Sequence, residues 1–253
     1  MRLFLIPEFY RGGSLLSLTG TDYHYLIRVL RYKKGYEFSG RDDKGNFFDL
    51  TLKEIFDDRC VLEVKKSVVE QIKLPEIILY QCVCKGKKMD QIIRQATEAG
   101  VYSIIPVVSD FSVPRLDTEK SGKIDRWCKV IREAIQQSGS GVNTQIEAPV
   151  TIDELPGIDE AACINSEIGL FFHQEALDHG TLHGYLNSQP MRISLVIGPE
   201  GGLSDREIEV LYNKNYTSVY LKTNVLRAET AALYAVSAVQ TILLESGNWV
   251  LKV

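Results

Sequence analysis

The chain has 253 residues, of which 45% are hydrophobic and 25% charged, and its net charge is −4. These values are typical of a soluble globular protein with one large domain or two smaller ones. No apolar run approaches the roughly 20 residues that a membrane-spanning helix needs, and the stretch before Pro7 is shorter than the apolar core of about 7–15 residues in a signal peptide. We therefore expect a cytoplasmic protein.

The cysteines and histidines give no sign of a disulfide or a metal site. The five cysteines are odd in number and include no CxxC pair, which favours reduced thiols. His179 and His183 are four residues apart, but neither an HExxH motif nor a set of converging carboxylates accompanies them. No metal is expected. The net charge alone argues mildly against a nucleic-acid partner, although basic residues gather at 28–34 and 85–88.

Residues 1–72 are predicted to form mainly short strands. One helix begins at Thr21 or Asp22 and runs to Gly35, with His24, Arg28 and Arg31 along one flank, because residues three and four apart are neighbours on a helix. The expected strands cover residues 3–6, 36–39, 47–55 and 60–66. The pattern predicts a small β-barrel that carries one helix.

Residues 73–253 alternate between buried strands and amphipathic helices, which predicts an α/β domain with a parallel sheet. Strands are expected at 77–83, 101–108, 169–172, 193–197 and 219–221, and helices at 90–99, 124–137, 174–186, 205–213 and 229–247. The change in composition near Leu74-Pro75 places the domain boundary between residues 72 and 73.

The stretch from Ile193 to Arg227 is the centre of the predicted sheet. An apolar strand ends at Gly198-Pro199-Glu200-Gly201-Gly202, and Ser204 with Glu207 forms a capping box that starts the next helix. The loops 198–202 and 222–227 are predicted to leave from the same edge, where ligands bind in such sheets. The turn is neither a GxGxxG fingerprint nor a Walker A loop, and by itself it is a weak signal.

Several motifs in combination are specific. The first is His24 followed by Val29-Leu30-Arg31, and the second is Lys85 and Lys88 followed by residues 98–101. The other two are IGPEGGL at residues 197–203 and VLRAETA at residues 225–231. With these elements the chain resembles the bacterial 16S rRNA uridine-N3 methyltransferases (the RsmE family), which belong to the SPOUT class of RNA methyltransferases.

The resemblance implies a fold that periodicity alone could not predict. Residues 1–72 would form a PUA-like β-barrel that docks RNA, and residues 73–253 a SPOUT α/β domain with a parallel sheet and a deep trefoil knot, a rare exception to unknotted connections. It also implies a homodimer. The expected partner is 16S rRNA or the small ribosomal subunit, contacted by basic side chains: His24, Arg28, Arg31, Lys85, Lys88 and Lys222.

The cofactor implied by the resemblance is S-adenosyl-L-methionine, bound largely by main chain. The expected contacts are Ile197, Gly198, Glu200, Gly202, Leu221, Val225 and Leu226. Arg227 would stabilise the negative charge that uridine develops as N3 loses its proton. Glu229 or Thr230 would orient Arg227 or the base, although Glu229 could simply favour a helix N-terminus.

Three positions depart from the family pattern. Lys222 and Asn224 stand where the family usually has a glycine and an arginine, and Ser140 stands where it usually has an arginine. Lysine cannot reproduce the bidentate fork of arginine. Two alternatives therefore remain open: a SPOUT enzyme that modifies another RNA, such as tRNA 2′-hydroxyls, and a ribosome assembly factor that binds without catalysis.

Overall fold

The computed structural model describes residues 3–42, 44–67, 75–112, 122–159, 167–188 and 190–246. The chain divides into two compact units: residues 1–72 with 135–143, and residues 73–134 with 144–253. Side-chain and main-chain contacts explain why the later segment belongs to the first unit. The buried Arg41 donates to the carbonyl of Ser140 at 3.1 Å, and the Leu3 N–H donates to the carbonyl of Gln136 at 3.0 Å.

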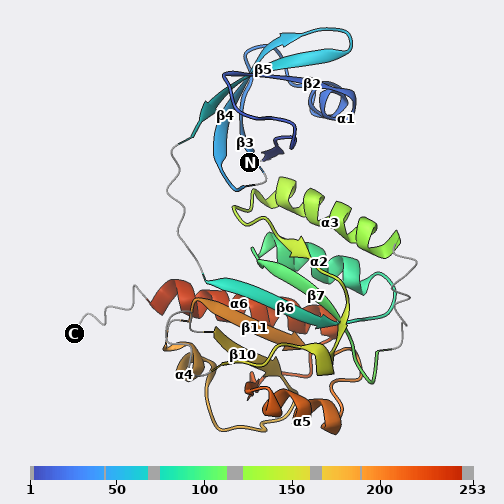
Figure 1. The fold of residues 1–253 in the computed structure, drawn as a ribbon, viewed down its shortest axis with the longest axis vertical. Coiled ribbons are helices and arrows are strands. Elements are labelled where there is room, and N and C mark those ends of the chain that lie inside the picture. Colours follow the sequence, from blue (N-terminus) through green and yellow to red (C-terminus); the bar gives the residue numbers. More distant parts are fainter. Residues whose placement is uncertain are drawn as a thin grey trace, which may run out of the picture. The chain divides into compact units, whose positions relative to one another are not determined.

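The first unit is built on a five-stranded sheet in the order β1-β3-β4-β5-β2, in which only the β1–β3 pairing is parallel (Figure 1). The strands are β1 (Phe4–Leu5), β2 (Leu15–Thr19), β3 (Glu37–Arg41), β4 (Phe47–Ile55) and β5 (Arg59–Lys66). Strand β2 was not predicted, although its alternate residues Leu16 and Leu18 are buried as the period of a strand requires. Closure of this sheet into a PUA-like barrel stays a prediction.

The helix of the first unit ends earlier than predicted. It consists of α1 (Gly20–His24) and a π-helical turn, η1 (Tyr25–Val29). Arg31 follows with a left-handed φ of 56°, and the Tyr32 N–H donates to the carbonyl of Leu26 at 3.0 Å. The left-handed residue ends the helix as in a Schellman motif, but the hydrogen bond reaches back six positions instead of five because it closes a wider π-helical turn. The helix therefore stops before Gly35.

The second unit contains a parallel sheet, as predicted. Its order is β12-β10-β11-β6-β7-β8, with β9 also paired to β7, and every pairing is parallel. The strands are β6 (Glu76–Cys82), β7 (Ser103–Val108), β8 (Gln145–Ile146), β9 (Val150–Thr151), β10 (Glu167–Phe172), β11 (Arg192–Ile197) and β12 (Tyr216–Val219). Strand β10 separates β11 from β12, so these two strands share a sheet without pairing.

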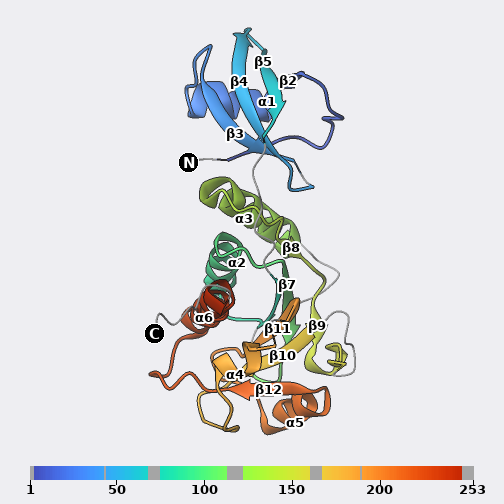
Figure 2. The same ribbon diagram turned by 90° about the vertical axis from the view of Figure 1, so that its left-hand side faces the viewer.

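Helices cover both faces of this sheet. Figure 2 shows α2 (Lys88–Glu98) and α6 (Ala228–Ser246) on one side. On the other face Leu211 of α5 (Asp205–Asn213) joins a core with Tyr80, Phe171 and Tyr216. The remaining helices are α3 (Gly122–Ser138), the 3-10 turn η2 (Ile152–Glu154) and α4 (Leu182–Leu186). Burial on both faces explains the nearly continuous apolar runs of the strands.

The predicted helix over residues 174–186 is wrong in its first half, because only α4 is helical. The Asp178 carboxylate accepts hydrogen bonds from the Tyr212 hydroxyl and the Ser218 N–H, both at 3.0 Å. These contacts hold the irregular segment before α4 against α5 and β12. Tertiary contacts therefore override a local helical pattern that was weak from the start.

Within the described ranges, no helix is long and apolar enough to cross a membrane. No group of three or more histidine, cysteine, aspartate or glutamate side chains in those ranges could hold a metal ion.

Candidate functional site

A cavity of about 430 Å³ opens at the carboxyl ends of β10, β11 and β12. Its wall consists of three segments together with Lys88 and Ala231. The segments are residues 172–174, residues 197–203, and residues 219–228 except Lys222. The two loops that the sequence placed at one sheet edge thus meet around one space. This is the edge where ligands bind in open α/β sheets.

The glycine-rich turn brings bare main chain to the cavity. Gly202 has a left-handed φ of 74°, and its N–H donates to the carbonyl of Pro199 at 3.0 Å. A Cβ atom on Gly198 would lie 3.1 Å from the carbonyl carbon of Gly202. Because that neighbour is main chain, it cannot turn aside as a flexible side chain could. Glycine at 198 therefore permits a close approach of two backbone segments, which leaves peptide groups as the surface that a ligand meets.

The helix that follows the turn starts where the sequence predicted. Ser204 Oγ accepts from the Glu207 N–H at 3.3 Å, and Glu207 Oε2 accepts from the Ser204 N–H at 2.9 Å, so the capping box is confirmed. The side chain of Glu207 is fully buried. Its second oxygen accepts from the Asp110 N–H at 2.9 Å, which joins the turn after β7 to the start of α5.

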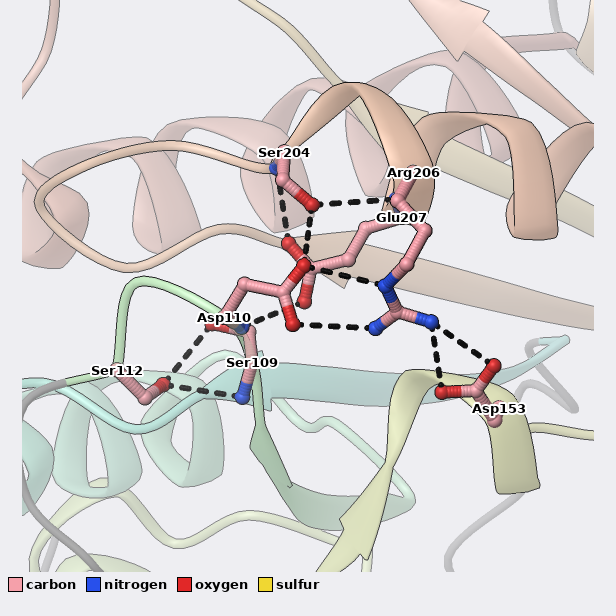
Figure 3. A network of polar contacts seen from close by, with 7 residues as sticks. All are labelled: Ser109, Asp110, Ser112, Asp153, Ser204, Arg206 and Glu207. Atoms are coloured by element: carbon pink, nitrogen blue, oxygen red, sulfur yellow. Dashed lines mark hydrogen bonds and ion pairs between the residues drawn. The ribbon is translucent and has the colours of Figure 1, made fainter.

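Figure 3 shows the network around this junction. Arg206 lies between two carboxylates, with Nη2 3.1 Å from Asp110 Oδ1 and Nη1 3.0 Å from Asp153 Oδ2. Ser204 Oγ also donates to Asp110 Oδ2 at 2.5 Å. The hydrogen bonds from Arg206 and Ser204 lower the pKa of Asp110. The network holds the base of the glycine-rich turn in one position.

The loop after β12 carries the second group of predicted residues. Lys222 has a left-handed φ of 50°, a conformation that glycine adopts at less cost. Val225 is 80% exposed, and Arg227 ends the loop at the N-terminus of α6, where its carbonyl accepts from the Thr230 and Ala231 N–H groups at 2.9 and 2.8 Å.

Lys88 joins two carboxylates at the cavity. Its Nζ lies 2.9 Å from Glu200 Oε1 and 3.8 Å from Glu229 Oε2. Glu200 Oε1 also accepts from the Lys85 N–H at 3.2 Å. Burial opposes ionisation of Glu200, but these hydrogen bonds outweigh it and lower its pKa. Hydrogen bonding to Glu200 raises the pKa of Lys88. The charge of Lys88 is thus balanced inside the protein.

The structure gathers the predicted cofactor residues in one place. All seven line the cavity: Ile197, Gly198, Glu200, Gly202, Leu221, Val225 and Leu226. Arg227 lines it as well, and Glu229 Oε2 is buried and has no hydrogen-bond partner among the described residues. Thr230 is exposed on the first turn of α6.

The predicted RNA contacts fall into two groups. His24, Arg28 and Arg31 are exposed in the first unit. Lys85 and Lys222 are exposed in the second unit, whereas Lys88 points into the cavity wall. The roles of all these residues, and of those at the cavity, stay predictions.

Sequence reasoning missed the wall that β10 provides. Phe172, His173 and Gln174 line the cavity because β10 lies between β11 and β12. His173 Nδ1 accepts from the Glu175 N–H at 3.2 Å, which leaves Nε2 as the protonated nitrogen of the neutral ring. The position of His173 directly after a buried strand was the available signal.

Comparison with known proteins identifies the class to which this fold and cavity belong. Residues 71–240 match the family model described as an RNA methyltransferase domain. The ribosomal RNA small subunit methyltransferase E of Aquifex aeolicus is 33% identical over 94% of this chain and 98% of its own length. The chain belongs to the ribosomal RNA small subunit methyltransferase E family.

Solved structures agree with this assignment. One is the structure of a putative methyltransferase from Legionella pneumophila in complex with bound SAM. It is 26% identical to this chain, with a TM-score of 0.78, and the match covers 94% of this chain and 96% of the Legionella chain. The fold is also that of a ribosomal RNA small subunit methyltransferase E from Neisseria gonorrhoeae, with a TM-score of 0.80 at 23% identity over 96% of this chain and 98% of that one.

Proposed function

We propose that this protein transfers a methyl group from S-adenosyl-L-methionine to N3 of a uridine in the decoding region of 16S rRNA. Membership of the small subunit methyltransferase E family supports an rRNA substrate. The observation that carries the proposal is the cavity at the sheet edge, which is lined by the glycine-rich turn and by Arg227, a cation that pairs with no carboxylate among the described residues. The motifs VLR and AETA at residues 225–231 support the choice of uridine N3.

The residues present fit the proposed cofactor. The main chain of Gly198 and Gly202 approaches so closely that a Cβ would not fit without a shift, and peptide groups there can hydrogen-bond an adenosyl group. The loop residues Leu221, Val225 and Leu226 supply the facing wall. When bound, S-adenosyl-L-methionine supplies an electrophilic methyl group.

Arg227 is the cation available to the substrate. Lys88 is balanced by Glu200 and Glu229, whereas no carboxylate in the described residues pairs with Arg227. As uridine loses its N3 proton, negative charge spreads onto O2 and O4. The exposed guanidinium of Arg227 stabilises this charge at the cavity mouth.

Glu229 and Thr230 then have positioning roles. Glu229 stands in the first turn of α6, where a carboxylate is stabilised by the helix N-terminus. It also lies 3.8 Å from Lys88 Nζ, which contacts Glu200 as well. Thr230 fixes the carbonyl of Arg227 through its N–H at 2.9 Å. These contacts keep the Arg227 backbone at the rim while its side chain is left for the base.

The rest of the expected organisation belongs to the same proposal. Residues 1–72 dock rRNA through His24, Arg28 and Arg31, and Lys85 and Lys222 add contacts from the second unit. Two chains associate as a cytoplasmic homodimer around a trefoil knot. Exposed apolar side chains of α6, Tyr234 at 47% and Leu244 at 46%, support association through this helix.

The test is transfer of labelled methyl groups to small ribosomal subunits from cells that lack this protein, with the product nucleoside identified by mass. N3-methyluridine is the expected product. Arg227→Ala should lower kcat/KM by about 100-fold, the loss typical of one charge-stabilising group. Arg94→Ala is the matched control, because Arg94 is exposed on α2 outside the cavity.

Other outcomes would select the alternatives. Transfer to tRNA 2′-hydroxyls instead of the subunit would mean another RNA substrate. Cofactor binding without transfer to any RNA would indicate a binding-only assembly factor, in keeping with Asn224 and Ser140 at positions where the family usually has arginine. Full activity of Arg227→Ala would refute the role given to Arg227.

A further inference from the structure

Three aromatic rings are in contact in a row that leads from the core of the first unit to its surface: Phe38, Tyr32 and Tyr36. The ring centroids of Tyr32 and Tyr36 are 4.1 Å apart with an interplanar angle of 27°, and those of Tyr32 and Phe38 are 5.1 Å apart. Phe38 is 6% exposed, whereas Tyr36 is 47% exposed. Tyr36 is therefore the outer ring of a stack whose inner ring is fixed in the core.

The backbone around Tyr36 is held firmly. The Gly35 N–H donates to the carbonyl of Leu52 at 2.7 Å, and the Leu52 N–H donates to the carbonyl of Tyr36 at 2.9 Å. The Tyr36 N–H donates to the carbonyl of Lys33 at 3.0 Å, which closes a tight turn. Strand β4 thus clamps both sides of the residue, so the exposed ring is presented on a rigid support.

Four cations lie close to Tyr36 in the sequence. Arg28, Arg31, Lys33 and Lys34 are all exposed, and none of them pairs with a carboxylate in the described residues. Residues 20–37 contain these four cations and two acidic residues, Asp22 and Glu37, so the segment carries +2 in a chain of net −4. The left-handed φ of 56° at Arg31 is tolerated here as part of the helix end.

An exposed aromatic ring with unpaired cations beside it matches a particular ligand. Single-stranded nucleic acid offers phosphates to the cations and the flat face of a base to the ring. A double-stranded RNA helix keeps its bases stacked inside and is recognised through phosphates and 2′-hydroxyls, so it leaves the ring unused. An acidic protein surface would use the cations but gains less from a stacked tyrosine.

We propose that Tyr36 stacks on an unpaired base of the RNA substrate while Arg28, Arg31, Lys33 and Lys34 contact the adjoining phosphates. This inference rests on the proposed RNA substrate and adds the kind of structure that the first unit docks, a single-stranded segment. The nucleotide bound at Tyr36 is a docking nucleotide. The reacting base belongs to the cavity of the second unit, and the described residues of its wall all come from that unit.

The experiment measures binding of the full chain to a fluorescent single-stranded RNA oligonucleotide of mixed sequence and to the same sequence as a duplex. Tyr36→Ala should weaken single-strand binding by about 5- to 150-fold, since removing one base–aromatic stack has that effect. Tyr36→Phe should bind like the unmodified chain. Phe9→Ala is the matched control, an aromatic of the same unit that is 62% exposed.

A second variant keeps the proposal falsifiable if Tyr36→Ala is poorly folded. Tyr36→Trp preserves the ring and adds a fluorophore, whose emission should be quenched when a base stacks on it. Lys33→Gln should weaken single strands and duplex alike and reduce the salt dependence of binding by about one phosphate contact. Tyr36→Ala should leave that salt dependence unchanged, because it removes no charge.

The outcomes separate this inference from the proposed enzyme. If subunits are methylated but Tyr36→Ala leaves both the KM for the subunit and oligonucleotide affinity unchanged, the docking inference fails alone. It also fails if duplex binding suffers as much as single-strand binding, or if an acidic peptide competes better than RNA. If no RNA is methylated while Tyr36→Ala still weakens single-strand binding and Tyr36→Trp is quenched, the docking inference stands and the proposed reaction fails.

Discussion

Replacement of Glu207 by glutamine tests whether a buried carboxylate holds the base of the glycine-rich turn. Glu207 has 0% exposure, and its two oxygens accept from the Asp110 N–H and the Ser204 N–H, each at 2.9 Å (Figure 3). Both partners are donors. A glutamine keeps one acceptor oxygen and places an NH₂ group against the other N–H, so one contact becomes donor against donor.

The magnitude follows from these two contacts. A hydrogen bond to a charged group contributes about 1.5–3 kcal/mol to stability, and a buried donor left unsatisfied costs about 1–3 kcal/mol. The two values describe partly the same loss, so they are not simply added. We therefore expect Glu207→Gln to lower the free energy of unfolding by about 3 kcal/mol. For a protein of this size that corresponds to a fall in Tm of about 6–12 °C.

Thermal and urea unfolding, followed by circular dichroism, measure the effect. Glu209→Gln is the control, because Glu209 lies on the same helix but is exposed. It removes the same charge and should change stability by no more than about 0.5 kcal/mol. An unchanged midpoint for Glu207→Gln would refute the reasoning, and so would an equal loss in both variants, because loss of charge alone would then explain the effect.

Three further predictions concern the second unit. Because the Asp110 pKa is lowered in the folded state, its contribution is present above the unfolded pKa of about 3.9 and is lost as pH falls through the folded pKa. The Tm difference between the unmodified chain and Asp110→Asn should therefore shrink below about pH 4; a constant difference would contradict this. Iodoacetamide at pH 8 should modify the exposed Cys128 first among the four described cysteines, which peptide mass mapping can check. The other three are buried, and burial raises the pKa of Cys60 to about 11, the pKa of Cys84 to about 12, and also the pKa of Cys82. Gly198→Ala should weaken cofactor binding in calorimetry by at least about tenfold, since its Cβ would meet the Gly202 backbone at 3.1 Å; unchanged affinity would mean that the turn can shift freely.

The second unit was the more predictable part of the fold. Its strands are buried on both faces and read as apolar runs, and local capping chemistry at Ser204 and Glu207 fixed the bounds of α5. The order of strand, glycine-rich turn and helix then predicted which loops share an edge. The joint presence of residues 198–202 and 223–227 in one cavity wall confirms that prediction.

Contacts between distant residues could not be predicted in this way. Arg41 is buried against Ser140, 99 positions away, and this pairing helps to join residues 135–143 to the first unit. Lys88 meets Glu200 across 112 positions. A sequence pattern identifies Lys88 as one member of a basic cluster, but only the fold determines which carboxylates approach it.

The net charge of −4 was an equally incomplete guide, because it counts paired and unpaired charges together. Lys88 belongs to the cluster at residues 85–88, yet two carboxylates balance it at the cavity. The cations at residues 28–34 are exposed and have no carboxylate partner in the described residues. Cations that neutralise phosphates release the counterions held by the nucleic acid, and a cation already held by carboxylates is less available for this contact. A negative net charge therefore does not exclude RNA binding, and the docking inference depends on the exposed cations close to Tyr36 in the sequence rather than on the net charge.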